Sequence, residues 1–325
     1  MTKPILTLEG LKTYFFADTG TFRAVDGVNF SLDQGETLGI VGESGSGKSV
    51  TALSILRLLD PPGKIVGGKV LFKGKDLVGF SSEKMRKIRG NEISMIFQEP
   101  MSSLNPLYKV GDQIAEIIKL HQGLNRKDSF RKAVELIESV GIPEPQNRAK
   151  DYPHQLSGGM QQRIMIAMAL SCRPRIMIAD EPTTALDVTI QAQILYLMKS
   201  LQRTIGTSII FITHDLGVIA RMARKVVVMY AGKIIESCNV FDLFESPLHP
   251  YTKALLSSIP AGQKGAQHNR FLRVIPGAVP NLANLPKGCA FSPRCVDAWD
   301  FCRQKSPDAF RINEDRIVNC WKYAN

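Results

Sequence analysis

The sequence predicts an α/β fold built around a parallel sheet, followed by a loop-rich C-terminal appendage. Short apolar segments alternate with helical patterns, which is the arrangement of a parallel sheet with crossover helices. A glycine-rich loop joins one of the predicted strands to a helix. After about residue 245 prolines become frequent and regular periodicity fades. We therefore divide the chain into residues 1–245 and 246–325.

The composition narrows the class of protein. Apolar residues make up 44% of the 325 residues and charged residues 22%, which excludes extensive disorder. The net charge of +11 suits an anionic partner such as a nucleotide, a nucleic acid or the inner membrane leaflet. The N-terminus lacks the apolar region of a signal peptide, and no apolar run is long enough to cross a bilayer. We expect an intracellular chain that reaches a membrane, if at all, through other proteins.

The expected elements follow the apolar pattern along the chain. Strands are predicted at 5–9, 27–32, 36–41, 176–179, 208–213 and 225–230, and a β-hairpin at 67–78. Helices are predicted at 49–59 and 189–204, and the segment from about 99 to 172 is mostly helical in pattern. The first of these helices is expected to end at Pro61-Pro62-Gly63.

The glycine-rich loop reads GESGSGKS and matches the phosphate-binding pattern GxxxxGK[ST] in full, between a predicted strand and a predicted helix. Its glycines allow successive backbone N–H groups to turn toward phosphates, and the following helix adds its positive end. Lys48 is expected to reach the β and γ phosphates, and the Ser49 hydroxyl to ligate Mg²⁺. The residues expected to hold the nucleotide here are Gly42, Ser44, Gly45, Ser46, Gly47, Lys48, Ser49 and Val50.

Two carboxylates end the apolar segment at 176–179. Asp180 is expected to hold Mg²⁺, and Glu181 to act as the general base that polarises the attacking water. A strand that ends in Asp-Glu is common by itself. Its combination with a complete phosphate loop favours the catalytic interpretation.

A second anion-binding helix start follows from the sequence Leu156-Ser-Gly-Gly-Met160, which opens a helical pattern. One nucleotide does not need two such helix starts from one molecule, so the second would serve a nucleotide held by another subunit. Together with the phosphate loop, this segment resembles the signature of the ATP-binding cassette (ABC) family. Ser157 and Gly159 would then contact the ATP of the partner subunit.

The resemblance covers about residues 5–245 and implies roles for further residues. Gln98 resembles the glutamine that senses Mg²⁺ and the γ-phosphate, and residues 185–187 resemble the D-loop that crosses the dimer interface. His214 matches the switch histidine that contacts the γ-phosphate. Phe15 is the best match to the aromatic residue that stacks on adenine, with Tyr14 and Phe16 as close alternatives.

The same resemblance implies the architecture of the cassette. Its fold class is a RecA-like P-loop ABC ATPase core with an antiparallel β-subdomain and an α-helical subdomain at about 99–172. The single phosphate loop argues against double-cassette translation factors. The length between Gln98 and Leu156 suits a compact helical subdomain rather than the long coiled coil of repair and chromosome-structure members. Of the classes of ABC ATPase considered, a stand-alone transporter ATPase remains.

Three segments resemble the ATPase subunits of dipeptide and oligopeptide importers: residues 99–114, residues 246–256 and the tail that begins at Gly288. The resemblance implies a peripheral subunit at the cytoplasmic face of the membrane. It would pair with a similar ATPase under two permease subunits, while an external binding protein delivers the substrate. Nickel importers share much of this pattern and stay an alternative. A non-transport ABC ATPase that acts on nucleic acid is the alternative of another class, although we expect no nucleic acid partner.

The cysteines are unevenly distributed. Cys172 and Cys238 are isolated and are expected to be ordinary thiols. The other four lie near the C-terminus with the spacing C-x5-C-x6-C-x17-C, and they are Cys289, Cys295, Cys302 and Cys320. Without a secretory signal, metal binding is favoured over disulfides.

The ligand of these four cysteines is predicted from their spacing and from the resemblance. Structural zinc sites usually contain a tight C-x2–4-C pair, which is missing here. Four thiolates on an irregular loop can hold a 4Fe-4S cluster, which some members of the peptide-importer branch carry. Zinc and free or oxidised thiols stay open as alternatives. Lys287 and Arg294 lie beside the cysteines, either as surface charges or as an offset to the charge of a cluster.

Overall fold

The computed structural model describes residues 3–98, 103–184, 186–258 and 275–324, and it divides into two compact units. The first unit comprises Met1–Ile5, Leu32–Thr37 and Gly79–Ile212, and the second comprises Leu6–Ser31, Leu38–Val78 and Thr213–Asn325. Residues 99–102 of the importer-like segment and Ala185 of the predicted D-loop lie outside the described residues.

The first unit contains a parallel sheet of β6 (Ile93–Ile96), β7 (Ile176–Asp180) and β8 (Ser208–Thr213). β7 lies between the other two and pairs in parallel with both. Residues of β7 and β8 are buried throughout, as expected for central strands of a parallel sheet. The strands predicted at 176–179 and 208–213 are thus confirmed.

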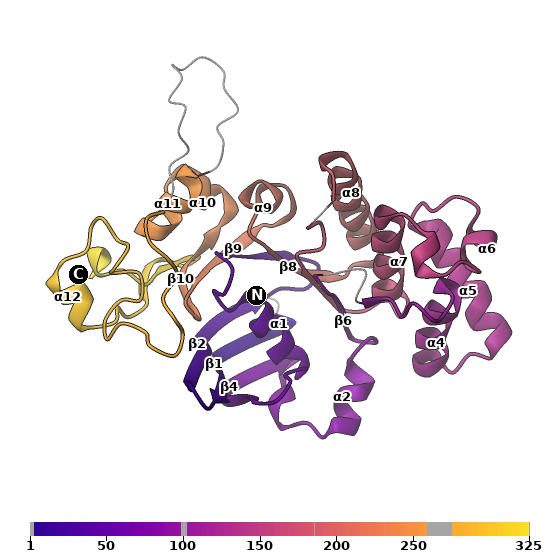
Figure 1. Ribbon diagram of the computed structural model, residues 1–325, viewed down its shortest axis with the longest axis horizontal. Coiled ribbons are helices and arrows are strands. Elements are labelled where there is room, and N and C mark those ends of the chain that lie inside the picture. Colours follow the sequence, from indigo (N-terminus) through magenta and orange to yellow (C-terminus); the bar gives the residue numbers. More distant parts are fainter. Residues whose placement is uncertain (1–2, 99–102, 185, 259–274, 325) are drawn as a thin grey trace, which may run out of the picture. The chain divides into compact units, whose positions relative to one another are not determined.

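Helices supply the rest of the first unit. They are α2 (Ser82–Ile88), α4 (Val110–Gln122), α5 (Arg126–Ser139), α6 (Pro145–Arg148), η2 (Pro153–Gln155), α7 (Gly158–Leu170) and α8 (Val188–Ile205). α4 to α7 group together in Figure 1 and form the helical subdomain that the sequence predicts. α4 buries Val110, Ile114 and Ile118, one residue per turn along a single face.

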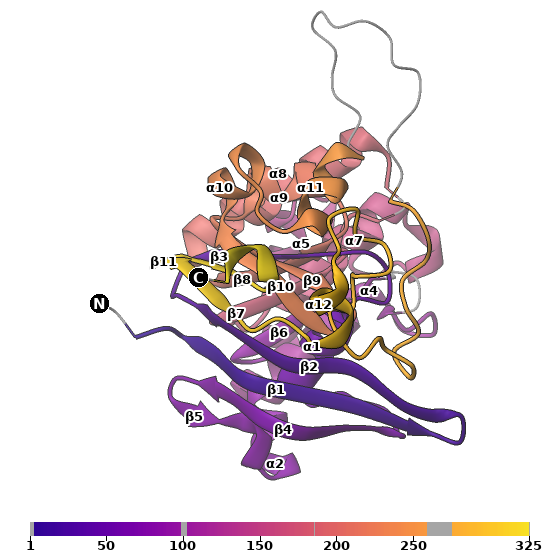
Figure 2. The ribbon, with the colours of Figure 1, turned by 90° about the vertical axis from the view of Figure 1, so that its left-hand side faces the viewer.

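An antiparallel sheet forms one part of the second unit, in the order β2-β1-β4-β5 (Figure 2). Its strands are β1 (Leu6–Ala17), β2 (Gly20–Leu32), β4 (Gly63–Phe72) and β5 (Lys75–Asp76). The hairpin predicted at 67–78 is present as β4 and β5. β1 extends well beyond the predicted strand at 5–9. Gly10 and Lys12 interrupt the apolar pattern after that segment, and the strand continues through them to Ala17.

In the same unit, β3 (Thr37–Val41) pairs in parallel with β9 (Lys225–Tyr230). β9 pairs antiparallel with β10 (Lys233–Asn239). The C-terminal appendage then adds to β10 the antiparallel strands β12 (Arg316–Val318) and β11 (Phe310–Asn313). The appendage is therefore joined by main-chain hydrogen bonds to a strand that precedes residue 246.

The helices of the second unit are short. They are α1 (Lys48–Leu56), η1 (Leu77–Gly79), α9 (Leu216–Met222), α10 (Val240–Glu245), α11 (Pro250–Ser257), α12 (Asp300–Gln304) and η3 (Trp321–Tyr323). α1 ends earlier than the predicted 49–59. Arg57 adopts a left-handed conformation, with φ of 53°, and its N–H closes the last turn on Leu53 and Ser54.

No helix in the described part of the chain is long and apolar enough to cross a membrane. The mixture of parallel sheet, antiparallel sheet and helical subdomain agrees with the fold class predicted from the sequence.

Candidate functional site

The phosphate loop lies between β3, whose residues are all buried, and the first residue of α1, Lys48. Gly47 caps this helix with φ of 102°. A Cβ added to Gly47 would lie 2.3 Å from the carbonyl oxygen of Ala24, so no other residue fits this position without displacing the backbone. The loop therefore brings backbone N–H groups and a helix N-terminus to one place, which is suitable for binding phosphates.

Lys48 is held by the loop itself. Its Nζ donates hydrogen bonds to the carbonyl oxygens of Gly42, at 2.8 Å, and Glu43, at 3.0 Å. The side chain is buried, whereas Ser44 and Gly45 at the tip of the loop are exposed. Among the described residues the buried hydroxyl of Ser46 has no hydrogen-bond partner. The loop thus presents an ammonium group and an unused hydroxyl beside its backbone amides.

Ser49 and Val50, which complete the predicted nucleotide-binding set on this loop, lie in the first turn of α1 and are half-buried. The Thr13 hydroxyl of β1 shares a 2.8 Å hydrogen bond with the Ser54 hydroxyl of α1. Because alternate residues of a strand share a face, Phe15 lies on the same face of β1 as Thr13. The β1 face of Phe15 is therefore the one that contacts α1.

The two alternatives to Phe15 differ in their surroundings. Tyr14 donates its hydroxyl hydrogen to Asp26 Oδ1 at 2.8 Å, and Arg23 lies over its ring at 5.9 Å. Burial, together with the hydrogen bond to Asp26, raises the pKa of the Tyr14 phenol. Phe16 is 47% exposed. The Tyr14 side chain thus already forms a polar contact with Asp26, and the Phe16 side chain is exposed to solvent.

In the first unit, Asp180 is buried at the last position of β7 and Glu181 follows it. Glu181 has φ of 47°, a left-handed conformation that is costly for a residue with a Cβ and is concentrated at functional sites. Glu181 Oε2 accepts hydrogen bonds from the Thr184 hydroxyl at 2.9 Å and from Gln98 Nε2 at 3.4 Å. The structure therefore brings Gln98 and Glu181 together within the first unit.

Ser157 and Gly159 lie at the start of α7, and Ser157 is exposed. The Ser157 hydroxyl accepts a hydrogen bond from the Met160 N–H at 3.4 Å, so it caps the helix as expected for a residue of this type. A Cβ at Gly159 would lie 3.1 Å from Ile190 of α8, which explains a small residue there. An exposed helix start of this kind is open to a ligand.

The predicted nucleotide-site residues are divided between the units. Phe15, the phosphate loop and His214 belong to the second unit, and His214 is exposed directly after β8. The first unit contains the other members: Gln98, Ser157, Gly159, Asp180 and Glu181. Each half has its own internal geometry, as described above.

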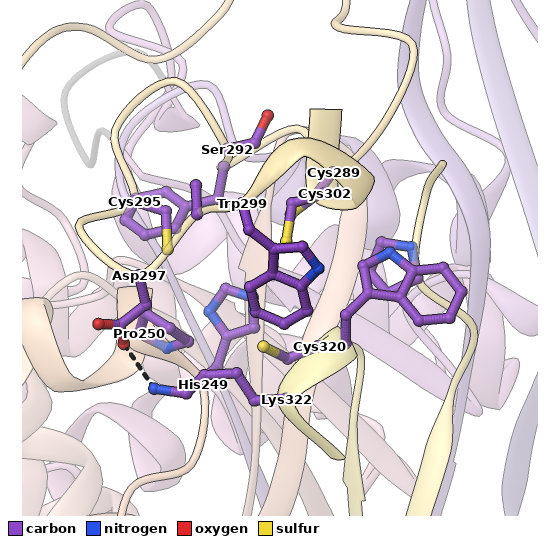
Figure 3. Close-up of a pocket in the computed structure, with 14 residues that line it drawn as sticks. His249, Pro250, Cys289, Ser292, Cys295, Asp297, Trp299, Cys302, Cys320 and Lys322 are labelled. Atoms are coloured by element: carbon purple, nitrogen blue, oxygen red, sulfur yellow. Dashed lines mark hydrogen bonds and ion pairs between the residues drawn. The ribbon is translucent and has the colours of Figure 1, made fainter. Parts of the chain in front are cut away.

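The C-terminal cysteines of the second unit line one pocket (Figure 3). Cys289, Cys295, Cys302 and Cys320 lie around it, together with His249, Phe291, Trp299 and Trp321. The main chain also joins two of these cysteines, since the Cys289 N–H donates to the Cys302 carbonyl oxygen at 2.7 Å. Residues distant in sequence are thus collected around one largely apolar space.

All four cysteines are free thiols, as are Cys172 and Cys238. Burial raises the pKa of Cys289 to about 11 and also raises the pKa values of Cys295 and Cys320, with a smaller contribution from the neighbouring cysteines. Among the described residues, no group of three or more His, Cys, Asp or Glu side chains is arranged to hold a metal ion. The pocket is therefore lined by four free cysteines that share a common space.

The sequence analysis missed several residues around these sites. Thr184 holds the Glu181 carboxylate, and the Tyr251 hydroxyl accepts a hydrogen bond from the Glu43 N–H at 2.8 Å. Arg294 is neither a surface charge nor paired with the cysteines, because it is buried and forms an ion pair with Glu43 at 2.8 Å. In the sequence, the position of Arg294 between two predicted metal ligands was the one feature that could have indicated a role other than that of a surface charge.

Each of the two parts of the chain matches a known protein family. Residues 25–184 match the family described as "ABC transporter", and residues 235–302 match "Oligopeptide/dipeptide transporter, C-terminal region". The second match includes Cys289, Cys295 and Cys302 and begins before the Pro-rich segment.

Individual proteins resemble the chain over nearly its whole length. The oligopeptide transport ATP-binding protein AppD of Bacillus subtilis is 51% identical, over 98% of this chain and 97% of its own. The dipeptide transport ATP-binding protein DppD of Escherichia coli is 48% identical, over 97% of this chain and 96% of its own. The dimeric ATP-binding cassette MJ0796, solved with ADP and Pi in a post-hydrolysis state, matches with a TM-score of 0.65 and 27% identity, over 72% of this chain and 98% of its own.

The phosphate loop, the Gln98–Glu181 pair and the signature helix start lie on a fold shared with an ATP-binding cassette, and the ABC transporter match covers all three. This chain therefore belongs to the ABC transporter family, among the ATP-binding proteins with an oligopeptide/dipeptide transporter C-terminal region, and is an ATP-hydrolysing transporter subunit.

Proposed function

We propose that this chain energises the import of dipeptides and oligopeptides by hydrolysing ATP at the cytoplasmic face of the membrane. The observation that carries the proposal is the C-terminal region, which matches the peptide-transporter family and forms strands on the β10 edge. The names of AppD and DppD support peptides over nickel, and they also favour transport over an activity on nucleic acid.

In this proposal the second unit binds the nucleotide. Lys48 and the backbone amides of residues 42–47 hold the phosphates, and the Ser49 hydroxyl supplies one oxygen ligand for Mg²⁺. Phe15 stacks on adenine. The hydrogen bond between Thr13 and Ser54 supports Phe15 over its neighbours, because it turns the Phe15 face of β1 toward the helix that follows the loop.

Four residues serve hydrolysis in this proposal: Gln98, Asp180, Glu181 and His214. Glu181 takes a proton from the attacking water, and its carboxylate is oriented by Thr184 and Gln98. Asp180 and Gln98 provide oxygen atoms, the ligand type that Mg²⁺ prefers. Mg²⁺ held by these residues would neutralise charge that develops on the phosphates. His214 donates a ring N–H to the γ-phosphate.

The active assembly pairs two ATPase subunits. Ser157 and Gly159 contact the ATP of the partner, which is supported by the exposed start of α7 and by the dimeric form of MJ0796. The partner is a second, homologous ATPase chain, and two permease subunits lie in the membrane above the pair. An external binding protein delivers the peptide.

We further propose that the cysteine pocket holds a 4Fe-4S cluster. Thiolates are the ligands of such clusters, and all four cysteines face the same pocket. The spacing of the four cysteines lacks the tight C-x2–4-C pair that is usual in structural zinc sites. A cluster is larger than one ion, so its ligands stand further apart. Bound to the four thiolates, the cluster would stabilise the fold of the C-terminal appendage.

The function is tested with Glu181→Gln in a strain that lacks the wild-type subunit. We expect uptake of labelled dipeptides and oligopeptides to be lost, because removal of a general base slows hydrolysis by about 10²–10⁴-fold. The purified variant should still bind ATP, since Lys48 and the loop are intact. Nickel uptake, measured in the same cells, should be unchanged.

The control is Glu135→Gln, a change to an exposed carboxylate in α5, which should leave both activities at the wild-type level. Hydrolysis by Glu181→Gln at the wild-type rate would contradict the role of Glu181. Loss of nickel uptake with intact peptide uptake would contradict the proposed substrate.

A further inference from the structure

The segment between Cys289 and Cys295 contacts the phosphate loop directly. The Arg294 guanidinium forms a two-pronged ion pair with Glu43, with Nη1–Oε2 at 2.8 Å and Nη2–Oε1 at 3.0 Å. Arg294 is almost fully buried, and the Glu43 side chain is 28% exposed. Because the two residues are 251 positions apart, the contact depends on tertiary structure alone.

Arg294 is itself fixed in place. Its Nε donates to the Pro276 carbonyl oxygen at 2.9 Å, and Nη1 also donates to the Tyr230 hydroxyl at 3.3 Å. The planar guanidinium matches a carboxylate with two parallel hydrogen bonds, which a lysine ammonium cannot do. Arg294 therefore sets both the position and the orientation of the Glu43 carboxylate.

Glu43 passes this constraint to the loop. Its N–H donates to the Tyr251 hydroxyl at 2.8 Å, and its carbonyl oxygen accepts from Lys48 Nζ at 3.0 Å and from the Ser46 N–H at 3.2 Å. Main chain and side chain of Glu43 are thus both held. The residue is the second of the phosphate loop, so its position determines the first turn and the environment of Lys48.

Aromatic packing supports the same contact. Phe291 lies between Cys289 and Cys295, and its ring is 5.3 Å from Tyr230 and 5.4 Å from Tyr251. The two tyrosine rings are 4.8 Å apart. Phe291 therefore stabilises the two tyrosines whose hydroxyls contact Arg294 and Glu43.

We propose that Arg294 is a positioning residue for ATP binding, which acts through Glu43 to keep the phosphate loop in its binding conformation. The proposal rests on the proposed role of this loop in binding ATP. Without Arg294, the partly buried Glu43 carboxylate loses its partner and turns toward water. The loop must then be ordered when ATP binds, and that cost lowers the affinity. The chemical step depends on Glu181 and is not altered.

The test compares Arg294→Gln, Arg294→Lys and Glu43→Gln. Binding of a fluorescent ATP analogue to the purified full-length chain gives Kd, and hydrolysis by the assembled transporter gives KM and kcat. We expect Arg294→Gln to raise Kd and KM by on the order of tenfold at nearly constant kcat. Arg294→Lys should recover part of the affinity. Arg294→Gln combined with Glu43→Gln should weaken binding no further than Arg294→Gln alone, because the pair acts as a unit.

The matched control is Arg316→Gln. Arg316 is a second buried arginine of the same unit, and it forms an ion pair with Glu236 at 3.1 Å without contacting the loop. We expect this variant to lower the Tm of the nucleotide-free protein and to leave Kd unchanged. A purely structural role of Arg294 predicts the same result for Arg294→Gln, which would overturn the proposal.

The variant Lys48→Ala tests the premise that the phosphate loop binds ATP, independently of the role proposed for Arg294. If Lys48→Ala abolishes binding while Arg294→Gln and Glu43→Gln do not change Kd, the inference about Arg294 is wrong. If Lys48→Ala binds ATP normally, the proposed nucleotide site itself is wrong. Should Arg294→Gln fail to fold, Glu43→Gln decides, because its amide oxygen can still accept one of the Arg294 hydrogen bonds.

Discussion

The phosphate loop and the cysteine pocket are both irregular segments of the second unit, but they are built from different parts of the chain. The phosphate loop presents mainly backbone N–H groups from one continuous stretch that ends at Lys48. The pocket presents side chains collected from His249 to Lys322. A site made of backbone is sensitive to added atoms, whereas a site made of side chains is sensitive to removed ones. This difference determines which substitutions should disrupt each site.

The largest expected effect is on the cysteine pocket, whose ligands are side chains. Cys302→Ser removes a buried proposed ligand from the pocket and should prevent cluster binding. Wild-type protein purified without oxygen should absorb broadly near about 400 nm and contain about four irons and four sulfides per chain. The variant should be colourless and several kcal/mol less stable, because metal binding contributes to folding free energy.

Cys172→Ser is the control for this comparison. Cys172 is half-buried in the first unit and does not line the pocket, so its loss should leave the iron content and the absorbance unchanged. A colourless wild-type protein with one zinc per chain would contradict the cluster and make the pocket a different metal site.

The second prediction concerns the phosphate loop, which is made mainly of backbone groups. Gly47→Ala places a Cβ 2.3 Å from the Ala24 carbonyl oxygen, whereas Gly45→Ala meets no atom within 4 Å. Both glycines have positive φ, at 102° and 77°. We expect Gly47→Ala to abolish ATP binding and to cost about 3–5 kcal/mol. Gly45→Ala should cost only about 1–2 kcal/mol, which reflects its left-handed conformation.

Urea unfolding and ATP titration of the two variants check this difference. Equal losses of stability and affinity would show that positive φ, rather than the close approach of Gly47 to Ala24, limits the loop. The comparison between the two sites would then rest on conformational strain instead of on space for a Cβ.

The smallest expected effect concerns the wall of the pocket. His249 is buried, and its Nδ1 accepts a hydrogen bond from the Tyr251 N–H at 3.0 Å. Burial lowers the pKa of His249 from 6.5 to about 3. The unfolded chain therefore takes up a proton near pH 6.5, while the folded chain does so only near pH 3. This contribution to stability is complete above pH 6.5 and is lost as the pH falls toward 3.

His249→Asn removes the titration and keeps an acceptor for the first turn of α11. Between pH 7 and pH 5, the wild type should lose about 2 kcal/mol more of its free energy of unfolding than the variant. Parallel pH profiles from urea unfolding would show that His249 is not held neutral by burial.

Local sequence was a good guide where one continuous segment forms the structure. The strands at 208–213 and 225–230 were predicted to the residue, because buried parallel strands are short apolar runs. It was a poor guide for β1, where Gly10 and Lys12 interrupt the apolar pattern, and for the end of α1, where Arg57 rather than a proline stops the helix. The paired strands β11 and β12 were not predicted, since they are short and depend on the edge of β10.

For the candidate site, local sequence motifs carry the chemistry of the residues in each unit. The phosphate loop, Asp180-Glu181 and the signature are contiguous motifs, so their residue types and spacing already specify their local geometry. Tertiary structure alone decided which side chains support them. The pairing of Gln98 with Glu181 and of Arg294 with Glu43, like the meeting of four cysteines around one pocket, joins residues that are remote along the chain. No periodicity encodes such contacts, because they form only when packing brings separate elements together.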